Sequence, residues 1–305
     1  MVSKEIYRRI KIMRTTATTG PIFGIVGEDE GIRLIAKAGY DCLDFGLGSL
    51  TKMDSPWLNP DYTEHAAHIV ELCKENGICV GQTHTPFLFR WEDPDDFKNI
   101  AMPNTIRSLE VSGLLGAPIA IVHPLHHLCY KDYGTMEYKQ NIDFYKALLP
   151  YAKEYNVKIA LENMFQYDNN GVTIPDMYAD IDEFKRAFDD LGNDPQFVAC
   201  VDVGHCGLGR CCTAGDMIRA LGHDYVHALH VHDNDNQKDR HTVPYLGTMD
   251  WDDICAALKE IKYDGDMCME VLGGYYKRFT DPELLLDAIH FANRIGRHLA
   301  KKIEE

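Results

Sequence analysis

Short runs of apolar and β-branched residues alternate with longer amphipathic stretches eight times along the chain. This alternation is typical of repeated βα units around a parallel sheet. We expect strands near residues 10–16, 42–45, 78–82, 119–122, 158–161, 197–201, 228–231 and 267–271. The helical stretches begin near Asp29, Pro60, Asp95, Met136, Ile181, Ala214, Trp251 and Pro282. The sequence therefore predicts an α/β fold.

The regular spacing of the eight units favours a closed (β/α)8 barrel, the TIM barrel, over an open doubly wound sheet. An open sheet uses the same unit, but it more often carries a phosphate-binding glycine loop after its first strand. The segment "TTATTGPIFG" has neither of the usual glycine spacings. Because no Pro/Ser-rich linker, low-complexity block or abrupt change of charge interrupts the chain, we expect residues 1–305 to form a single barrel domain.

The balance of charge argues against polyanionic partners. The chain has 31 Lys and Arg against 47 Asp and Glu, a formal net charge of -16, so its average surface field repels DNA and anionic membranes. Its 10 Cys residues are scattered through apolar runs, which indicates reduced core thiols. The segment "MVSKEIYRRIKIMR" has no apolar signal region, and no apolar run has the length of a membrane span. We expect a cytoplasmic protein that binds neither nucleic acid nor membrane.

Polar side chains of metal-ligand type lie at or just after the ends of most predicted strands, where an α/β barrel builds its active site. They are His84, His123, Glu162, Asp202, His205, His230, His232, Asp239, His241 and Glu270. Glu162 and Glu270 directly follow apolar strands, where an unpaired carboxylate costs several kcal/mol. A divalent cation offsets that cost. Because the donors are oxygen and nitrogen rather than thiolate, Mn2+, Co2+, Mg2+ and Zn2+ all fit.

The run "LHVHDNDNQKDRHTVPYLGTMDWDDICAALKEIKYDGDMCMEV" resembles the C-terminal signature of sugar phosphate isomerase/epimerase-like proteins of the xylose-isomerase-like superfamily. "ALEN" and "VDVGH" match the same superfamily, so the resemblance covers about residues 78–272, whereas the first two units match only in general pattern. It implies that one divalent ion, Mn2+ first among the four, is bound by Glu162, Asp202, His230 and Glu270. It also implies that Glu162 and Glu270 move protons and that His205 lies beside a substrate hydroxyl.

The resemblance implies an isomerase or epimerase that removes a proton next to the carbonyl of a sugar and forms an enediolate. The side chains expected to contact the substrate are His84, His123, His232, Asp239, Arg240, His241, Phe87 and Trp91. Elimination from the same enolate is the alternative, because inosose dehydratases and the catalytic subunits of C-glycoside deglycosidases resemble this group. A homo-oligomer or a separate small partner subunit is compatible with either activity.

A second alternative is a zinc phosphodiesterase similar to endonuclease IV, which has the same barrel. The chain has a candidate for each of that enzyme's three-zinc ligands: His84, His123, Glu162, Asp202, His205, His230, Asp239, His241 and Glu270. The acidic charge argues against DNA binding, which depends largely on neutralising phosphates with Lys and Arg. In addition, "LGTM" lacks a Glu expected in that family, and His232 with Asn234 fits the sugar enzymes better. A structural or sensory metal site is the least favoured reading, since the ring has more donors than one cation accepts.

Overall fold

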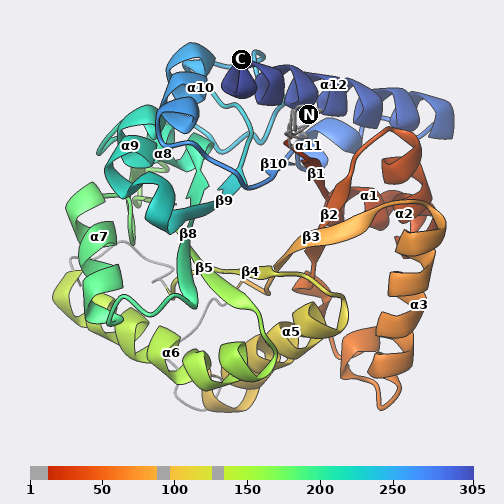
Figure 1. Cartoon of the computed structure of the whole chain (residues 1–305), viewed down its shortest axis with the longest axis horizontal. Coiled ribbons are helices and arrows are strands. Elements are labelled where there is room, and N and C mark those ends of the chain that lie inside the picture. The colour runs from red at the N-terminus through yellow and green to blue at the C-terminus, as the bar shows by residue number, and fades with distance from the viewer. Residues whose placement is uncertain (1–12, 88–96, 126–133) are drawn as a thin grey trace, which may run out of the picture.

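The computed structural model describes residues 13–87, 97–125 and 134–305, and its centre is an eight-stranded parallel sheet curled into a barrel (Figure 1). The strand order is β10-β1-β2-β3-β4-β5-β8-β9. The strands are β1 (Thr15–Thr18), β2 (Cys42–Gly46), β3 (Cys79–His84), β4 (Ile119–Val122), β5 (Lys158–Glu162), β8 (Phe197–Asp202), β9 (Val226–His230) and β10 (Met267–Met269). A separate antiparallel hairpin joins β6 (Phe165–Tyr167) to β7 (Thr173–Pro175).

The sheet closes between β9 and β10 through a single parallel bridge, Val231 to Met269, flanked by backbone hydrogen bonds. Val231 N donates to the carbonyl of Cys268, and Glu270 N donates to the carbonyl of Val231. Because β10 also pairs with β1, the first strand of the barrel lies beside the last. The predicted TIM barrel is confirmed, and the open doubly wound sheet is excluded.

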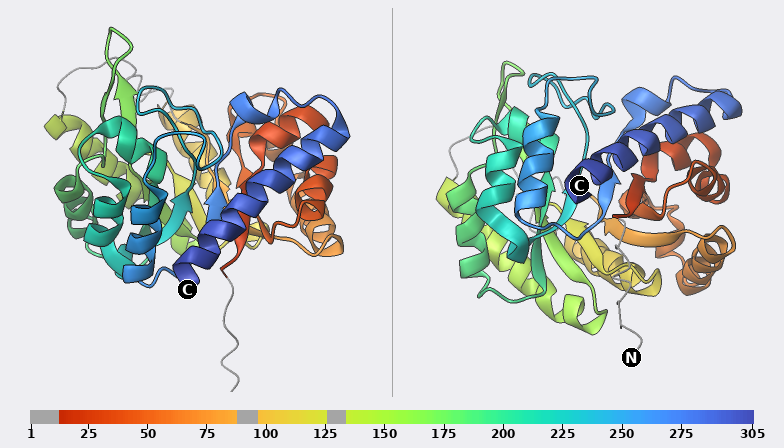
Figure 2. Two further views of the ribbon diagram at one scale, coloured as in Figure 1. Left: turned by 90° about the horizontal axis from the view of Figure 1, so that it is seen from above. Right: turned by 45° about the horizontal axis from the view of Figure 1, so that its top comes forward.

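Helices surround the barrel and cover the outer face of its strands (Figures 1 and 2). They are α1 (Gly20–Val26), α2 (Glu28–Lys37), α3 (Tyr62–Glu75), α5 (Met102–Leu114), α6 (Gly134–Glu154), α7 (Ile181–Asp190), α8 (Val203–Gly209), α9 (Ala214–Tyr225), α10 (Trp251–Glu260), α11 (Gly273–Tyr276) and α12 (Pro282–Glu304). Short turns of other helix types are η1 (Gly48–Thr51), η2 (Pro56–Leu58) and η3 (Phe97–Ala101). Within the described ranges, no helix combines the length and apolar character needed to cross a membrane.

Four helix starts lie where the sequence predicts them, because a capping side chain precedes each one. Asp180, Thr213, Asp250 and Asp281 each accept a hydrogen bond from a backbone N–H in the first turn of α7, α9, α10 and α12. A carboxylate or hydroxyl at this position satisfies a donor that the helix itself leaves unpaired. Local chemistry therefore fixes these boundaries.

The first strand differs from the prediction: β1 spans Thr15–Thr18 rather than residues 10–16. Its start is set by distant partners, because Thr15 pairs with Met267 and donates its backbone N–H to the Asp41 carboxylate at 2.7 Å. Strands β3, β5 and β8 run further toward the active-site end than predicted, so His84, Glu162 and Asp202 are themselves the last residues of their strands. Strand β9 instead ends one residue earlier than predicted, at His230.

The apolar core has two parts. A large layer lies between the strands and the surrounding helices, and a small cluster fills the inside of the barrel. The inner cluster consists of Ile121, Ala160, Val198, Cys200 and Ala228. These side chains come from β4, β5, β8 and β9 and close the barrel below the polar residues at the strand ends. The barrel interior is therefore filled with apolar side chains, and the polar residues of the site lie above them at the carboxyl ends of the strands.

Candidate active site

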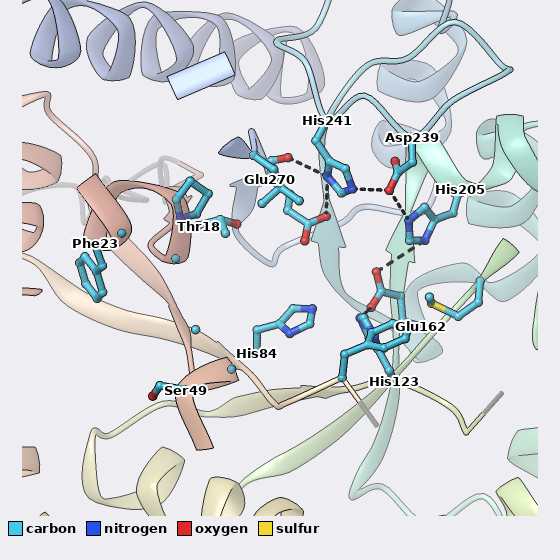
Figure 3. Close-up of a pocket in the computed structure, with 18 of the residues that line it drawn as sticks. Thr18, Phe23, Ser49, His84, His123, Glu162, His205, Asp239, His241 and Glu270 are labelled. Atoms are coloured by element: carbon cyan, nitrogen blue, oxygen red, sulfur yellow. Dashed lines mark hydrogen bonds and ion pairs between the residues drawn. The ribbon is translucent and has the colours of Figure 1, made fainter. Parts of the chain in front are cut away.

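The carboxyl ends of the strands surround a cavity of about 910 Å³. Its polar lining includes Thr18, Ser49, Lys52, His84, His123, Glu162, His205, Asp239, His241 and Glu270. Figure 3 shows a continuous chain of contacts on one wall, from Glu270 through His241, Asp239 and His205 to Glu162. The cavity is large enough for a small molecule.

The base of this wall is a single imidazole faced by three carboxylates. His230 Nδ1 lies 2.8 Å from Glu162 Oε1, 3.4 Å from Glu270 Oε2 and 3.9 Å from Asp202 Oδ2. All four side chains are buried, and Glu270 Oε2 makes no hydrogen bond to any described residue. Three buried carboxylates that converge on one imidazole nitrogen form an oxygen and nitrogen donor set that fits a bound divalent cation. The four side chains predicted as ligands thus lie together.

The pKa values express the same excess of negative charge. Burial together with repulsion from Asp202 and Glu162 raises the pKa of Glu270 well above its usual range. Burial alone would lower the pKa of His230, but Glu162, Asp44 and Asp202 outweigh burial and raise it to about 9. A proton or a cation is therefore needed at this centre.

A second group of donors lies beside the first. His205, His232, Asp239 and His241 each offer a ligand atom within 4.8 Å of the others. Asp239 Oδ2 lies 2.6 Å from His241 Nε2 and 3.9 Å from His205 Nε2. Burial would lower the pKa of His205, but Asp202 and Asp239 outweigh burial and raise it to about 10. In the absence of a metal, His205 is a cation at neutral pH.

A third group consists of His84, His123 and Glu162. His123 Nε2 lies 2.7 Å from Glu162 Oε2, and the edge of the His123 ring contacts the His84 ring. Burial and the neighbouring His123 lower the pKa of His84 to about 4, so this imidazole is neutral at physiological pH. The Phe87 ring packs edge-on against His123 at a centroid distance of 4.5 Å and forms part of the cavity lining.

The sequence model of one protein family, the xylose isomerase-like TIM barrel, matches residues 32–295 of this chain. This chain belongs to that family. A match of this length includes every element from α2 to the middle of α12. It therefore contains the strand ends from β2 to β10.

Two relatives of this chain are distant from it in sequence. The chain is 25% identical over 202 residues to an uncharacterised protein of Methanocaldococcus jannaschii and 28% identical over 163 residues to an uncharacterised protein of Sinorhizobium fredii. These matches span 61% and 51% of this chain but only 62% and 47% of the two relatives.

Solved structures cover far more of the chain. The IOLI protein with a bound zinc atom superposes with a TM-score of 0.75 at 18% identity, over 95% of this chain and 99% of that one. A D-psicose 3-epimerase with D-tagatose from Clostridium cellulolyticum H10 superposes with a TM-score of 0.71 at 18% identity, over 94% and 99% of the two chains. At these identities the likeness establishes the family fold.

The segment "VDVGH" has a local structural reason for its residue order. Asp202 accepts a hydrogen bond from the backbone N–H of His205 at 2.8 Å and so caps α8. Gly204 lies directly under the His232 ring, and a Cβ on Gly204 would be 2.1 Å from His232 Cε1. His232 Nε2 in turn lies 3.0 Å from Asp202 Oδ1. Only glycine leaves room for the imidazole that orients this carboxylate.

The sequence patterns do not identify Asn163 as part of the site, although it joins two of the strand ends. Its side chain accepts from Asp202 N at 2.9 Å and donates to the Asp202 carbonyl at 3.0 Å. The Asn163 carbonyl accepts a hydrogen bond from His205 Nδ1 at 2.9 Å. Because Asn163 follows Glu162 directly, one backbone segment positions Glu162, Asp202 and His205 together. An amide directly after a strand-end carboxylate in "ALEN" was the available signal.

Asp44 is a further buried carboxylate that the predicted set lacks. It lies on β2 with no exposed surface, accepts from Thr18 Oγ1 at 3.1 Å, and has its Oδ2 3.7 Å from His230 Nε2. Asp44 therefore faces the Nε2 side of the His230 ring, opposite the Nδ1 side that faces Glu162. A charged residue inside the apolar run "CLDF" was the signal, but the resemblance begins only at residue 78.

The expected substrate-contacting residues do not all reach the cavity. His84, His123, Asp239, His241 and Phe87 line it, whereas His232 is fully buried behind Asp202. Arg240 is not among the residues that line the cavity: its side chain is half exposed, and its Nε pairs with Asp235 Oδ2 at 2.6 Å. The loop conformation, not the sequence order, decides this direction. Trp91 lies outside the described residues.

Proposed function

We propose that this protein is a divalent-metal-dependent enzyme that moves a proton next to the carbonyl of a sugar or sugar-like ketone, as an isomerase or epimerase. The observation that carries the proposal is the group of three buried carboxylates around His230 Nδ1, with Glu162 and Glu270 also lining the cavity. The ligands would be Glu162, Asp202, His230 and Glu270, with Mn2+ the first candidate. Bound there, the cation would polarise the substrate carbonyl and acidify the adjacent C–H bond.

The proton transfer belongs to the two glutamates. One carboxylate removes the proton from the carbon beside the carbonyl, and the other delivers a proton to the opposite face or to the neighbouring carbon. Both carboxylates line the cavity, where they can reach a bound substrate. Delivery to the opposite face gives epimerisation, and delivery to the neighbouring carbon gives isomerisation.

His205 would stabilise the oxygen that gains negative charge. Its Nδ1 donates to the Asn163 carbonyl at 2.9 Å, which fixes the orientation of the ring. A fixed donor aimed at developing charge lowers the barrier because it needs no reorganisation. His84, His123, Asp239 and His241 supply further hydrogen-bonding groups around the substrate hydroxyls.

The structural relatives support a sugar-like substrate. Besides the two described above, they include a D-allulose 3-epimerase from Methylomonas in complex with D-allulose and a 3-keto-D-glucoside 4-epimerase from E. coli. These proteins are named for, or bound to, small polyhydroxylated molecules or a zinc atom. We therefore take a ketose, an inositol ketone or an oxidised glycoside as the substrate class.

The test combines metal content with hydrogen exchange. The purified protein is analysed for metals and then incubated in D2O with a panel of ketoses, inositol ketones and oxidised glycosides. We expect about one Mn, Co, Mg or Zn per chain and deuterium incorporation next to the carbonyl of at least one compound. A product that has lost water or an aglycone would assign the lyase alternative. Metal-replete protein that exchanges no panel member would overturn the proposal.

The two flanking donor groups favour a second candidate, a multinuclear zinc phosphodiesterase. All nine positions named for that enzyme class lie in the three neighbouring groups around Glu162. Close to three zinc ions per chain, with cleavage of DNA at abasic sites and no C–H exchange, would select this function. The net charge of -16 argues for the sugar enzyme.

A further inference from the structure

Two cysteines face each other at the amino end of the barrel, the end opposite the cavity. Cys42 begins β2 and Cys79 begins β3, and the two residues are register partners in these neighbouring parallel strands. Their Sγ atoms are 3.1 Å apart. Cys42 is fully buried, whereas Cys79 is exposed. One thiol of the pair is therefore open to reagents from solution, and the other is protected behind it.

Charged groups hold this pair in a defined setting. Arg14 Nη1 lies 3.5 Å from Cys79 Sγ, and the same guanidinium makes two hydrogen bonds to Asp266 at 2.9 and 2.8 Å. The Asp41 carbonyl accepts from the Cys79 thiol at 3.8 Å and from the Cys79 backbone N–H at 3.2 Å. Asp266 thus holds the positively charged Arg14 guanidinium beside the exposed Cys79 sulfur. A neighbouring positive charge favours the thiolate form of a cysteine.

We propose that Cys42 and Cys79 form an oxidisable dithiol site, in which a hydroperoxide converts the two thiols into a disulfide that joins β2 to β3. An S–S bond is about 2.0 Å long, so the Sγ atoms, now 3.1 Å apart, must approach by only about 1 Å. Neighbouring strands lie about 4.7–4.9 Å apart, which is within the range of Cα separations that disulfides span. This site is independent of the proposed sugar chemistry.

The two thiols have opposite acidities. The hydrogen bond from Cys42 and the charge of Arg14 outweigh burial, Asp266 and Asp41, and lower the pKa of Cys79 to about 7. The hydrogen bond to Cys79 and burial raise the pKa of Cys42. Cys73, on the neighbouring α3, has a pKa raised to about 11 by burial. Cys79 is therefore the nucleophile, and Cys42 is the resolving thiol.

The reaction takes place in two balanced steps. The Cys79 thiolate attacks one oxygen of hydrogen peroxide, the O–O bond breaks, and a sulfenic acid and hydroxide form. The Cys42 sulfur then attacks the Cys79 sulfur, the S–S bond forms, the S–O bond breaks, and water leaves with the Cys42 proton. Two thiols are oxidised, and one peroxide is reduced to two waters. A thiol reductant reverses the change.

The full-length protein is treated with hydrogen peroxide, alkylated, digested and mapped by mass spectrometry without reduction. We expect a linked peptide pair containing Cys42 and Cys79, which disappears with dithiothreitol. The thermal midpoint of the oxidised protein should rise and return after reduction, because the new bond closes a loop between residues 37 positions apart. Sulfonic acid on Cys79 with Cys42 still reduced, or linkage only between other cysteines, would overturn the proposal.

Variants separate the two roles. Cys42→Ser should leave Cys79 as a sulfenic acid that dimedone traps, whereas Cys79→Ser should leave Cys42 unmodified. Cys211→Ser, which removes another exposed thiol, is the matched control and should form the same linked pair. If either strand variant fails to fold, Arg14→Gln tests the setting. It should slow alkylation of Cys79 at pH 7 by about threefold or more, and an unchanged rate would contradict the role of Arg14.

Discussion

The two ends of the barrel are built from the same strands but treat charge in opposite ways. At the carboxyl end, Glu162, Asp202 and Glu270 crowd around one imidazole, and Glu270 Oε2 lacks a hydrogen bond to any described residue. At the amino end, Asp266 pairs with Arg14 through two hydrogen bonds, and Asp41 pairs with Arg297 at 2.6 Å. Unmatched charge thus marks the end that contains the cavity, and matched charge marks the opposite end, where ion pairs join the strands to their neighbours.

A single strand contributes residues to both the amino end and the carboxyl end of the barrel. In β2, Cys42 belongs to the amino end and Asp44 to the site; in β3, Cys79 belongs to the amino end and His84 to the site. The solid inner cluster of the barrel separates them. Substitutions at the two ends should therefore have separable consequences.

The largest effect is expected at the carboxyl end. Glu270→Gln and Glu162→Gln each remove a carboxylate that we propose transfers a proton, so each should lower the rate of C–H exchange by about 10²-fold or more. The measurement is deuterium incorporation under saturating metal and substrate. Glu110→Gln, on the outer helix α5, is the matched control and should keep the full rate. Near-normal exchange by both site variants with metal bound would break the assignment.

The second largest effect is expected from metal removal, which should change the stability contributed by the carboxyl end but not that of the amino end. A chelator should remove the proposed metal and leave the three carboxylates unmatched, and restoring a divalent ion at about 100 times its Kd should stabilise the fold by about 2.7 kcal/mol. Thermal melts with and without Mn2+ measure this gain. Asp202→Asn should abolish most of it, whereas Asp266→Asn at the amino end should keep it. Equal loss in both variants would show that the ends are not separable.

The amino end should have its own pH dependence. Because the pKa of Cys79 is about 7 and the thiolate is the reactive form, its alkylation should be half-maximal near pH 7 and about tenfold faster at pH 8 than at pH 6. Iodoacetamide labelling with peptide mapping gives the rate at each pH. The stripped and metal-loaded proteins should give the same profile, and a shift on metal binding would link the two ends.

The smallest effect is expected from the surface part of the amino end. Asp266→Asn weakens the ion pair with Arg14, whose side chain is 43% exposed, so solvent screening should limit the loss to about 0.5–1 kcal/mol. Urea unfolding measures the difference, and C–H exchange should stay unchanged. A loss above about 3 kcal/mol would indicate that this pair behaves as a buried one.

The sequence predicts most of the fold and much of the site where local chemistry decides. Helix starts after Asp180 and Thr213 are readable because a capping side chain acts on its own first turn. Glu162 and Glu270 are readable because a carboxylate at the end of an apolar strand requires a partner.

Tertiary pairing decides the rest. The start of β1 depends on Met267, which is distant in sequence, so local alternation misplaces it. The sequence does not show that Arg240 turns toward Asp235, or that His230 faces the carboxylates while His232 lies buried behind Asp202. Loop conformation and packing settle such directions, and neither has a short sequence signature.

The pairing of β1 with β10 also has a consequence for synthesis on the ribosome. Beyond that pairing, Thr15 Oγ1 donates to Asn293 on α12, and Asn293 Nδ2 donates to the Ala38 carbonyl. Strand β1 therefore cannot pair with β10 until nearly the whole barrel has been translated. At typical elongation rates this delay is on the order of ten seconds or more. Throughout that interval the nascent sheet has an open edge, which is the kind of surface that chaperones bind.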